Sequence, residues 1–204
     1  MNPRDDEIEL RRRLGDLSAV SRAAFAAACA ERLRTAYSRS LSAESEWLTR
    51  RALDLAWAFS ATGGVALAET PECLLSLEAS LRPHDEIVDG EAGLREQAIL
   101  TAVLYALRQC AHEGGDDAFW VARQLTDAID ERAQSQLEVG LLTTDDERTL
   151  ETHPSINREI RRQLLDLEEA SRAGTDAASL SSLRRRAQFA DASLERSLGV
   201  GSDG

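Results

Sequence analysis

Apolar residues recur every three or four positions through nearly the whole chain, a spacing that places them along one face of a helix. No segment shows the two-residue alternation that is typical of a half-buried strand. Two of the clearest stripes are Phe25, Cys29, Leu33 and Tyr37, and Leu48, Ala52, Leu55 and Phe59. The pattern predicts an all-α fold, a single-domain antiparallel helical bundle of about seven to nine helices.

Turn and capping residues divide this pattern into separate helices. We expect helices over residues 4–14, 18–41, 42–62, 70–81, 92–112, 116–139, 154–170 and 176–198. Gly63-Gly64 should end the third helix, and Thr70 should cap the fourth, with Pro71 at its first position. Because the connections are short, neighbouring helices should be mostly antiparallel.

The helix expected over 92–112 is apolar nearly all round, so we expect it to lie at the centre of the bundle. No fixed repeat of 30–45 residues is present, which disfavours a helical solenoid. We expect one helical domain over residues 1–198, followed by a frayed C-terminal tail at 199–204.

The net charge of −12 is unevenly distributed along the chain. Residues 113–151 contain three arginines against eleven aspartates and glutamates, a local net charge of −8. A surface of this kind makes nucleic acid an unlikely partner, because phosphate binding needs basic patches, and it favours a basic protein partner. All 24 basic residues are arginine, so chemistry that needs a lysine amine, such as a Walker phosphate loop or a Schiff base, is excluded.

Targeting and membrane segments are not expected. The longest strongly apolar run without a charged residue, residues 97–107, is too short to cross a bilayer. The first thirty residues lack the pattern of a secretory signal peptide, and we expect a cytoplasmic protein without membrane contact.

Metal and catalytic motifs are also not expected. The histidines His84, His112 and His153 are isolated, and Cys29 and Cys110 lie on apolar faces, where a thiol packs as a small hydrophobic group. Cys73 follows a helix start, but no histidine base is near it in sequence. We therefore expect no metal, no cofactor and no catalytic residue, with all three cysteines as free thiols.

Asp54 stands between Leu53 and Leu55 at the edge of an apolar stripe, one helical turn after Arg50. An acid in this place needs a partner, since a buried charge without one lowers the stability of the fold by roughly 3 to 5 kcal/mol. Two structural interpretations remain open, an Arg50–Asp54 pair within the helix and a buried link between two helices. Either one gives Arg50 and Asp54 a structural role rather than a chemical one.

The helix that begins near Asp116 has an acidic outward side. At 100° per residue, Trp120 lies among the carboxylates of Asp127, Asp130 and Glu131, opposite the apolar stripe. Two interpretations are open, a tryptophan folded over a neighbouring loop and an anchor for a binding partner. Under the second, the predicted partner-binding residues are Trp120, Asp127, Asp130, Glu131, Asp145, Asp146 and Glu147.

Four segments of the chain, AFAAACAERLRTAY (24–37), LTRRALDLAWAF (48–59), the alanine-rich helix at 92–112 and ETHPSINREIRRQ (151–163), carry a family resemblance. In their order and spacing they resemble the YjaG-like bacterial family, domain of unknown function 416, across residues 8–175. The resemblance implies a compact helical bundle and brings no established activity, so no catalytic residue is implied. One position departs from the family pattern, because Gln97 stands in the place of an aspartate.

These features favour a non-enzymatic acidic helical binding protein that neutralises a basic partner, by analogy with immunity proteins. The alternative is a small-molecule or metal-dependent enzyme with a site between helices, using residues such as Asp54 and His112.

Overall fold

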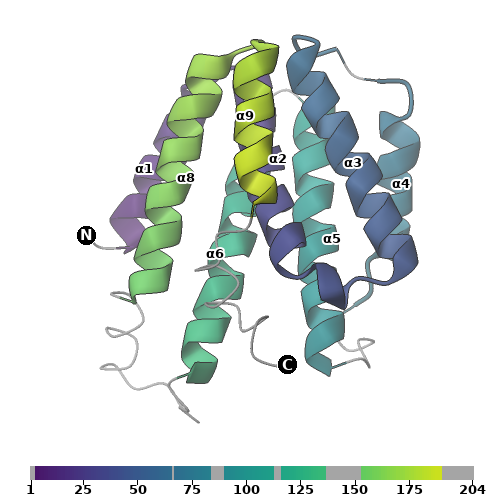
Figure 1. Ribbon diagram of the computed structural model, residues 1–204, viewed down its shortest axis with the longest axis vertical. Helices are drawn as coiled ribbons and strands as arrows, with labels where there is room; N and C mark the ends of the chain where they lie inside the picture. Colours follow the sequence, from purple (N-terminus) through teal and green to yellow (C-terminus); the bar gives the residue numbers. More distant parts are fainter. Residues whose placement is uncertain (1–2, 66, 84–89, 113–115, 137–152, 190–204) are drawn as a thin grey trace.

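The computed structural model describes residues 3–65, 67–83, 90–112, 116–136 and 153–189 (Figure 1). Within these ranges there are eight α-helices, one short 3-10 helix and no β-strand. They are α1 (Pro3–Gly15), α2 (Ala19–Ala36), η1 (Ser38–Ser40), α3 (Ala43–Ala61), α4 (Thr70–Ser80), α5 (Gly90–Ala111), α6 (Asp117–Gln136), α8 (Pro154–Ala173) and α9 (Ala177–Gln188). The all-α fold and the number of helices expected from the sequence are confirmed.

The helix ends follow the chemistry of the sequence. The side chains of Ser18, Ser42 and Asp176 each accept a hydrogen bond from a backbone N–H in the first turn of α2, α3 and α9. After α3, the φ of Gly64 is +93°, a conformation that favours glycine, and the predicted end at Gly63-Gly64 is confirmed. The predicted cap at Thr70 is wrong by one residue: α4 begins at Thr70, because Glu69 already has a helical backbone.

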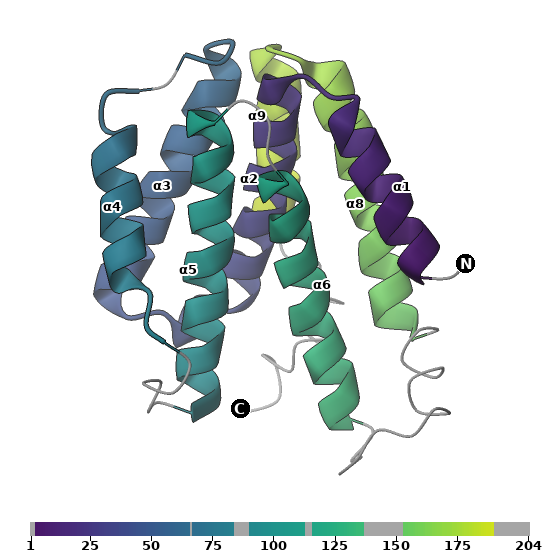
Figure 2. The same cartoon turned by 180° about the vertical axis from the view of Figure 1, so that it is seen from behind.

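α2 lies at the centre of the bundle, between α3, α5, α6, α8 and α9 (Figures 1 and 2). α4 packs outside against α3 and α5, while α1 packs against α6 and α8. Our expectation that helix 92–112 would be central is therefore wrong. The corresponding helix, α5, packs mainly on α2, α3, α4 and α6, whereas α2 also packs on α8 and α9.

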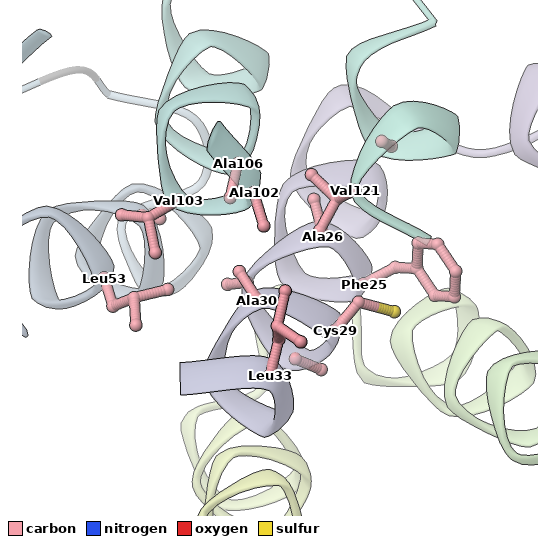
Figure 3. Packing of buried hydrophobic residues seen from close by; sticks show 14 of the residues in the cluster. Phe25, Ala26, Cys29, Ala30, Leu33, Leu53, Ala102, Val103, Ala106 and Val121 are labelled. Atoms are coloured by element: carbon pink, nitrogen blue, oxygen red, sulfur yellow. The ribbon is translucent and has the colours of Figure 1, made fainter. Parts of the chain in front are cut away.

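Small side chains explain why α2 and not α5 is central. Every residue from Ala23 to Leu33 is buried, and six of these eleven are alanines. Figure 3 shows Ala26 and Ala30 of α2 with Ala102 and Ala106 of α5 in the space between these two helices. Because alanine side chains are small, neighbouring helices can approach such a helix closely from all sides. It can therefore be central although it is less hydrophobic than α5.

Two further sequence expectations concern the end of the chain and membranes. Residues 190–198, which we expected in the last helix, and the tail 199–204 lie outside the described residues. No helix in the described part combines the length and apolarity that crossing a membrane requires.

Candidate functional site

The outward side of α6 is the surface that the sequence singled out. The residues predicted to face inward are all buried, namely Ala118, Val121, Ala122, Leu125, Ala128 and Ile129. Trp120 lies on the other side of the helix and is 43% exposed. The predicted orientation of α6 is therefore confirmed for these residues, and a large aromatic side chain is partly in contact with water.

Trp120 is part of an aromatic corner that α1 covers in part. Its ring meets Phe119 edge to face, with 5.4 Å between centroids. The guanidinium carbon of Arg11 on α1 lies 4.0 Å from the Phe119 ring centroid and 5.6 Å from that of Trp120. Arg11 also pairs with Asp116, with 3.3 Å between Nη1 and Oδ2. The corner thus holds a guanidinium through cation–π contacts and one carboxylate.

The carboxylates of α6 are partly neutralised by neighbours. Asp127 accepts a hydrogen bond of 2.7 Å from Nε of Arg123, and Arg123 also pairs with Glu7 on α1. Partial burial raises the pKa of Asp127 above its usual range, with the Arg123 charge opposing this shift. Asp130 accepts a 3.1 Å hydrogen bond from the side-chain amide of Gln134.

Glu131 is exposed at the same end of α6. The other predicted partner-binding residues, Asp145, Asp146 and Glu147, lie outside the described residues. The described part of the predicted surface therefore consists of Trp120, Asp127, Asp130 and Glu131.

A buried ionic cluster joins α2 to α8, and the sequence pattern did not predict it. Nη2 of Arg32 donates a 2.7 Å hydrogen bond to Oε1 of Glu159, and Nη1 of the same arginine pairs with Asp166. All three side chains are at most 5% exposed. Two carboxylates therefore share one guanidinium inside the fold, while Arg162 and Arg186 approach the other oxygen of Asp166 from partly exposed positions.

Cys29 lies beside this cluster, with its sulfur 3.6 Å from Nη2 of Arg32. Burial raises the pKa of the Cys29 thiol to about 12, although the Arg32 charge opposes the shift. The thiol is therefore protonated at neutral pH, the form that is a poor nucleophile.

A second buried acid, Glu31, joins the middle of α2 to α3 and α9. It accepts hydrogen bonds from Nε1 of Trp57 at 3.2 Å and from Nη2 of Arg34 at 3.0 Å. Nε of Arg184 on α9 lies 3.8 Å from its carboxylate. Glu31 is thus held by groups from three helices and is unavailable to a ligand.

Asp54 and Arg50 do not pair with each other among the described contacts. Arg50 pairs with Glu46 at 2.5 Å, whereas Asp54 pairs with Arg184 of α9. Asp54 therefore links two helices, as one of our two interpretations required, but its side chain is 45% exposed and the link is not buried.

The alternative of a metal-dependent or small-molecule enzyme can be compared with the described part of the chain. This part contains no group of three His, Cys, Asp or Glu residues that could hold a metal ion. Asp54 on α3 faces Arg184 of α9, whereas His112 follows α5 and lies near Asp117 of α6, so the structure does not bring Asp54 and His112 together. An apolar pocket between α1, α6 and α8 has a volume of about 60 Å³. Ligand pockets typically measure roughly 300 to 1,000 Å³, so this one is too small for a substrate.

One feature of the sequence does indicate the buried cluster in retrospect. Glu31 and Arg32 interrupt an otherwise alanine-rich helix directly before the stripe residue Leu33, and Asp166 stands between two leucines. A charged residue inside an apolar pattern is either exposed to water or buried with a partner of opposite charge. The sequence around it does not show which, because the partner comes from a distant segment.

Comparisons with known proteins identify the fold and not an activity. No protein-family model matches the sequence. No curated protein matches it either. The structure is similar to that of a DUF416 family protein from Shewanella baltica, with a TM-score of 0.72 and 16% sequence identity over 86% of this chain and 91% of the other. This neighbour carries the domain of unknown function that the sequence resembles, and the helical bundle implied by the resemblance is confirmed.

Proposed function

We propose that this chain is a non-enzymatic binding protein and that the outward side of α6 binds a basic protein partner. The proposed contact residues are Trp120, Asp127, Asp130 and Glu131, extended by Asp145, Asp146 and Glu147. The mode of action is occupation of the partner's surface, by analogy with inhibitors of the immunity type. Three free cysteines favour a reducing compartment, and we propose the cytoplasm.

The position of the partly exposed Trp120 on the same side of α6 as Asp127, Asp130 and Glu131 is the observation that carries this proposal. A side chain of this size is 43% exposed on a helix whose other face is fully packed. Tryptophan is enriched among the residues that contribute most to binding energy at protein interfaces, because it buries a large rigid surface. Carboxylates around such an anchor accelerate the approach of a basic partner and discriminate against acidic ones.

The contact made by Arg11 supports the chemistry of the proposed partner. Arg11 belongs to the chain itself, and its guanidinium already lies against Phe119, Trp120 and Asp116. Arginines on a partner can make the same kinds of contact, one with the exposed part of Trp120 and another, about 15 Å further along α6, with Asp130 or Glu131. The proposed partner is therefore rich in arginine at its contact surface.

The test is capture from the native lysate by wild type and by matched variants. Trp120→Ala and Asp130→Arg should lose a basic protein that wild type retains in stoichiometric amount. Trp47→Ala and Glu78→Arg are the controls, because Trp47 is 67% exposed on α3 and Glu78 is exposed on α4, both outside the proposed surface. Absence of such a protein, or equal retention by all variants, would contradict the proposal.

A further inference from the structure

The segment from α1 to α2 and the start of α6 line a second, larger cavity, which opens to solvent beside the aromatic corner of Trp120. Its volume is about 560 Å³, and its lining residues are Arg11, Leu14, Arg22, Asp116, Ala118 and Phe119, with Gly15. Figure 2 shows the connection from α1 to α2 and the start of α6 in the same upper half of the bundle. The volume lies within the range of small-molecule sites, which is roughly 300 to 1,000 Å³.

Arg22 is the unusual residue in this lining. It is half-buried, and among the described residues no carboxylate pairs with it. Its Nη1 donates a 2.8 Å hydrogen bond to the backbone carbonyl of Leu17, while its buried Nε, like those of Arg32, Arg34 and Arg184, has no acceptor. Most other half-buried or buried arginines described here, including Arg32, Arg34 and Arg184, have a carboxylate partner. A partly buried cation without a counter-charge favours the binding of an anion.

The remaining lining residues define what kind of anion fits. Arg11 and Arg22 bring two positive charges to the cavity, and Asp116, which pairs with Arg11, brings one negative charge. The local balance is therefore positive, although the chain as a whole has a net charge of −12. Leu14, Ala118 and Phe119 form an apolar wall on the same cavity. A cationic part and an apolar part together match a carboxylate attached to an apolar body.

We propose that this cavity binds a small organic carboxylate, with its carboxyl group at Arg22 and Arg11 and its apolar part against Leu14 and Phe119. Guanidinium groups bind carboxylates through charge-assisted hydrogen bonds, which are roughly twice as strong as those between neutral groups. The site shares Arg11, Asp116 and Phe119 with the aromatic corner beside Trp120, whereas Arg22 belongs to the cavity alone.

The experiment uses phenylacetate as the probe and titration calorimetry on the full chain as the measurement. Wild type should bind phenylacetate with 1:1 stoichiometry and should bind the neutral phenylacetamide at least about tenfold more weakly, since only the carboxylate uses the arginines. Inorganic phosphate should also bind more weakly than phenylacetate, because it makes no use of the apolar wall. Equal binding of the acid and the amide, or of phosphate and phenylacetate, would overturn the assigned ligand class.

Matched variants identify the site. Arg22→Gln and Arg11→Gln should each weaken phenylacetate binding at least about tenfold, whereas Arg12→Gln should not. Arg12 is the control because it lies on the same helix but is exposed and pairs with Glu9 and Asp16. Asp130→Arg, at a position about 15 Å beyond Trp120 along α6, should bind phenylacetate like wild type, which separates this result from the test of the proposed function.

Folding is checked by thermal unfolding without the probe. Arg22→Gln should remain folded with a Tm near that of wild type, because the loss of the bond to the Leu17 carbonyl is offset by removal of a charge without a carboxylate partner. It should lose the rise in Tm that phenylacetate gives wild type. No binding to wild type at about 10 mM probe, or unchanged affinity in Arg22→Gln, would overturn the proposal.

Discussion

Arg32 and Glu159 form a buried ion pair that joins the central helix α2 to α8, with 2.7 Å between Nη2 and Oε1 and side chains that are 3% and 5% exposed. Asp166 completes the cluster from about two helical turns further along α8. A buried pair of this kind contributes little net stability compared with apolar residues, but it becomes costly when one member is removed. Loss of any one member should therefore be costly, even though the cluster as a whole adds little stability.

The first prediction follows from this asymmetry. Arg32→Met should lower the free energy of unfolding by about 3–5 kcal/mol, because Glu159 and Asp166 would remain buried without their shared counter-charge. Urea denaturation measures the change. Arg50→Ala is the control: its pair with Glu46 is exposed, and the loss should be below about 1 kcal/mol. Equal effects of the two substitutions would contradict the role given to the buried cluster.

The second prediction concerns Asp54. From the sequence, Asp54→Ala would cost roughly 1–4 kcal/mol if the acid were buried. Its side chain is 45% exposed, and that of its partner Arg184 is 31% exposed, so water screens the pair. We therefore expect a loss within about 1 kcal/mol, measured by urea denaturation. A loss as large as that of Arg32→Met would mean that the α3–α9 link is tighter than its exposure indicates.

The elements that were predicted from the sequence are those that local information determines. Helix α3 was expected over 42–62 and spans Ala43–Ala61, because its apolar stripe, its serine cap and Gly63-Gly64 all lie within one segment. The outward position of Trp120 was found in the same way, from the helical period alone.

The elements that were missed depend on contacts between distant segments. The central position of α2 results from alanines that let other helices approach, and a hydrophobicity pattern ranks such a helix below the more apolar α5. The pairing of Arg32 with Glu159 joins residues 127 positions apart, which periodicity cannot reveal. The cavity at Arg22 is likewise formed by three separate helices.

The third prediction concerns the three thiols. Burial raises the pKa of Cys29 and of Cys110 to about 12, so both thiols are almost entirely protonated at about pH 8. The folded protein should therefore react slowly with dithionitrobenzoate and release three equivalents only when unfolded. Burial also raises the pKa of Cys73, though less strongly, so the first equivalent should come from Cys73 and disappear in Cys73→Ala. A fast reaction of the folded Cys73→Ala variant would show that Cys29 or Cys110 is accessible.

The fourth prediction tests the packing around α2. Ala26 is fully buried beside α5, and a leucine there would force the two helices apart (Figure 3). Ala26→Leu should lower the free energy of unfolding by about 1–3 kcal/mol in urea denaturation. Ala61→Leu, at the exposed end of α3, is the matched control and should change stability by less than about 0.5 kcal/mol. If Ala26→Leu were neutral, the close approach of α2 and α5 would not depend on the small side chain.

The last prediction separates the two kinds of residue on the proposed partner surface, and it is measured by binding kinetics with the captured partner. Asp127→Arg and Asp130→Arg should mainly slow association, and added salt should have the same effect on wild type, since charges act on the approach of the partner. Trp120→Ala should instead accelerate dissociation and cost about 2 kcal/mol or more of binding free energy, because the indole supplies contact after docking.

The same surface should also show a pH dependence. Burial raises the pKa of Asp127, so this carboxylate becomes protonated at a higher pH than is usual for aspartate. Association with the basic partner should therefore begin to slow at that higher pH as the pH is lowered. Asp127→Asn should remove this pH dependence. All variants should keep the circular dichroism of wild type, and kinetics unaffected by any of them would leave this side of α6 an ordinary solvated surface.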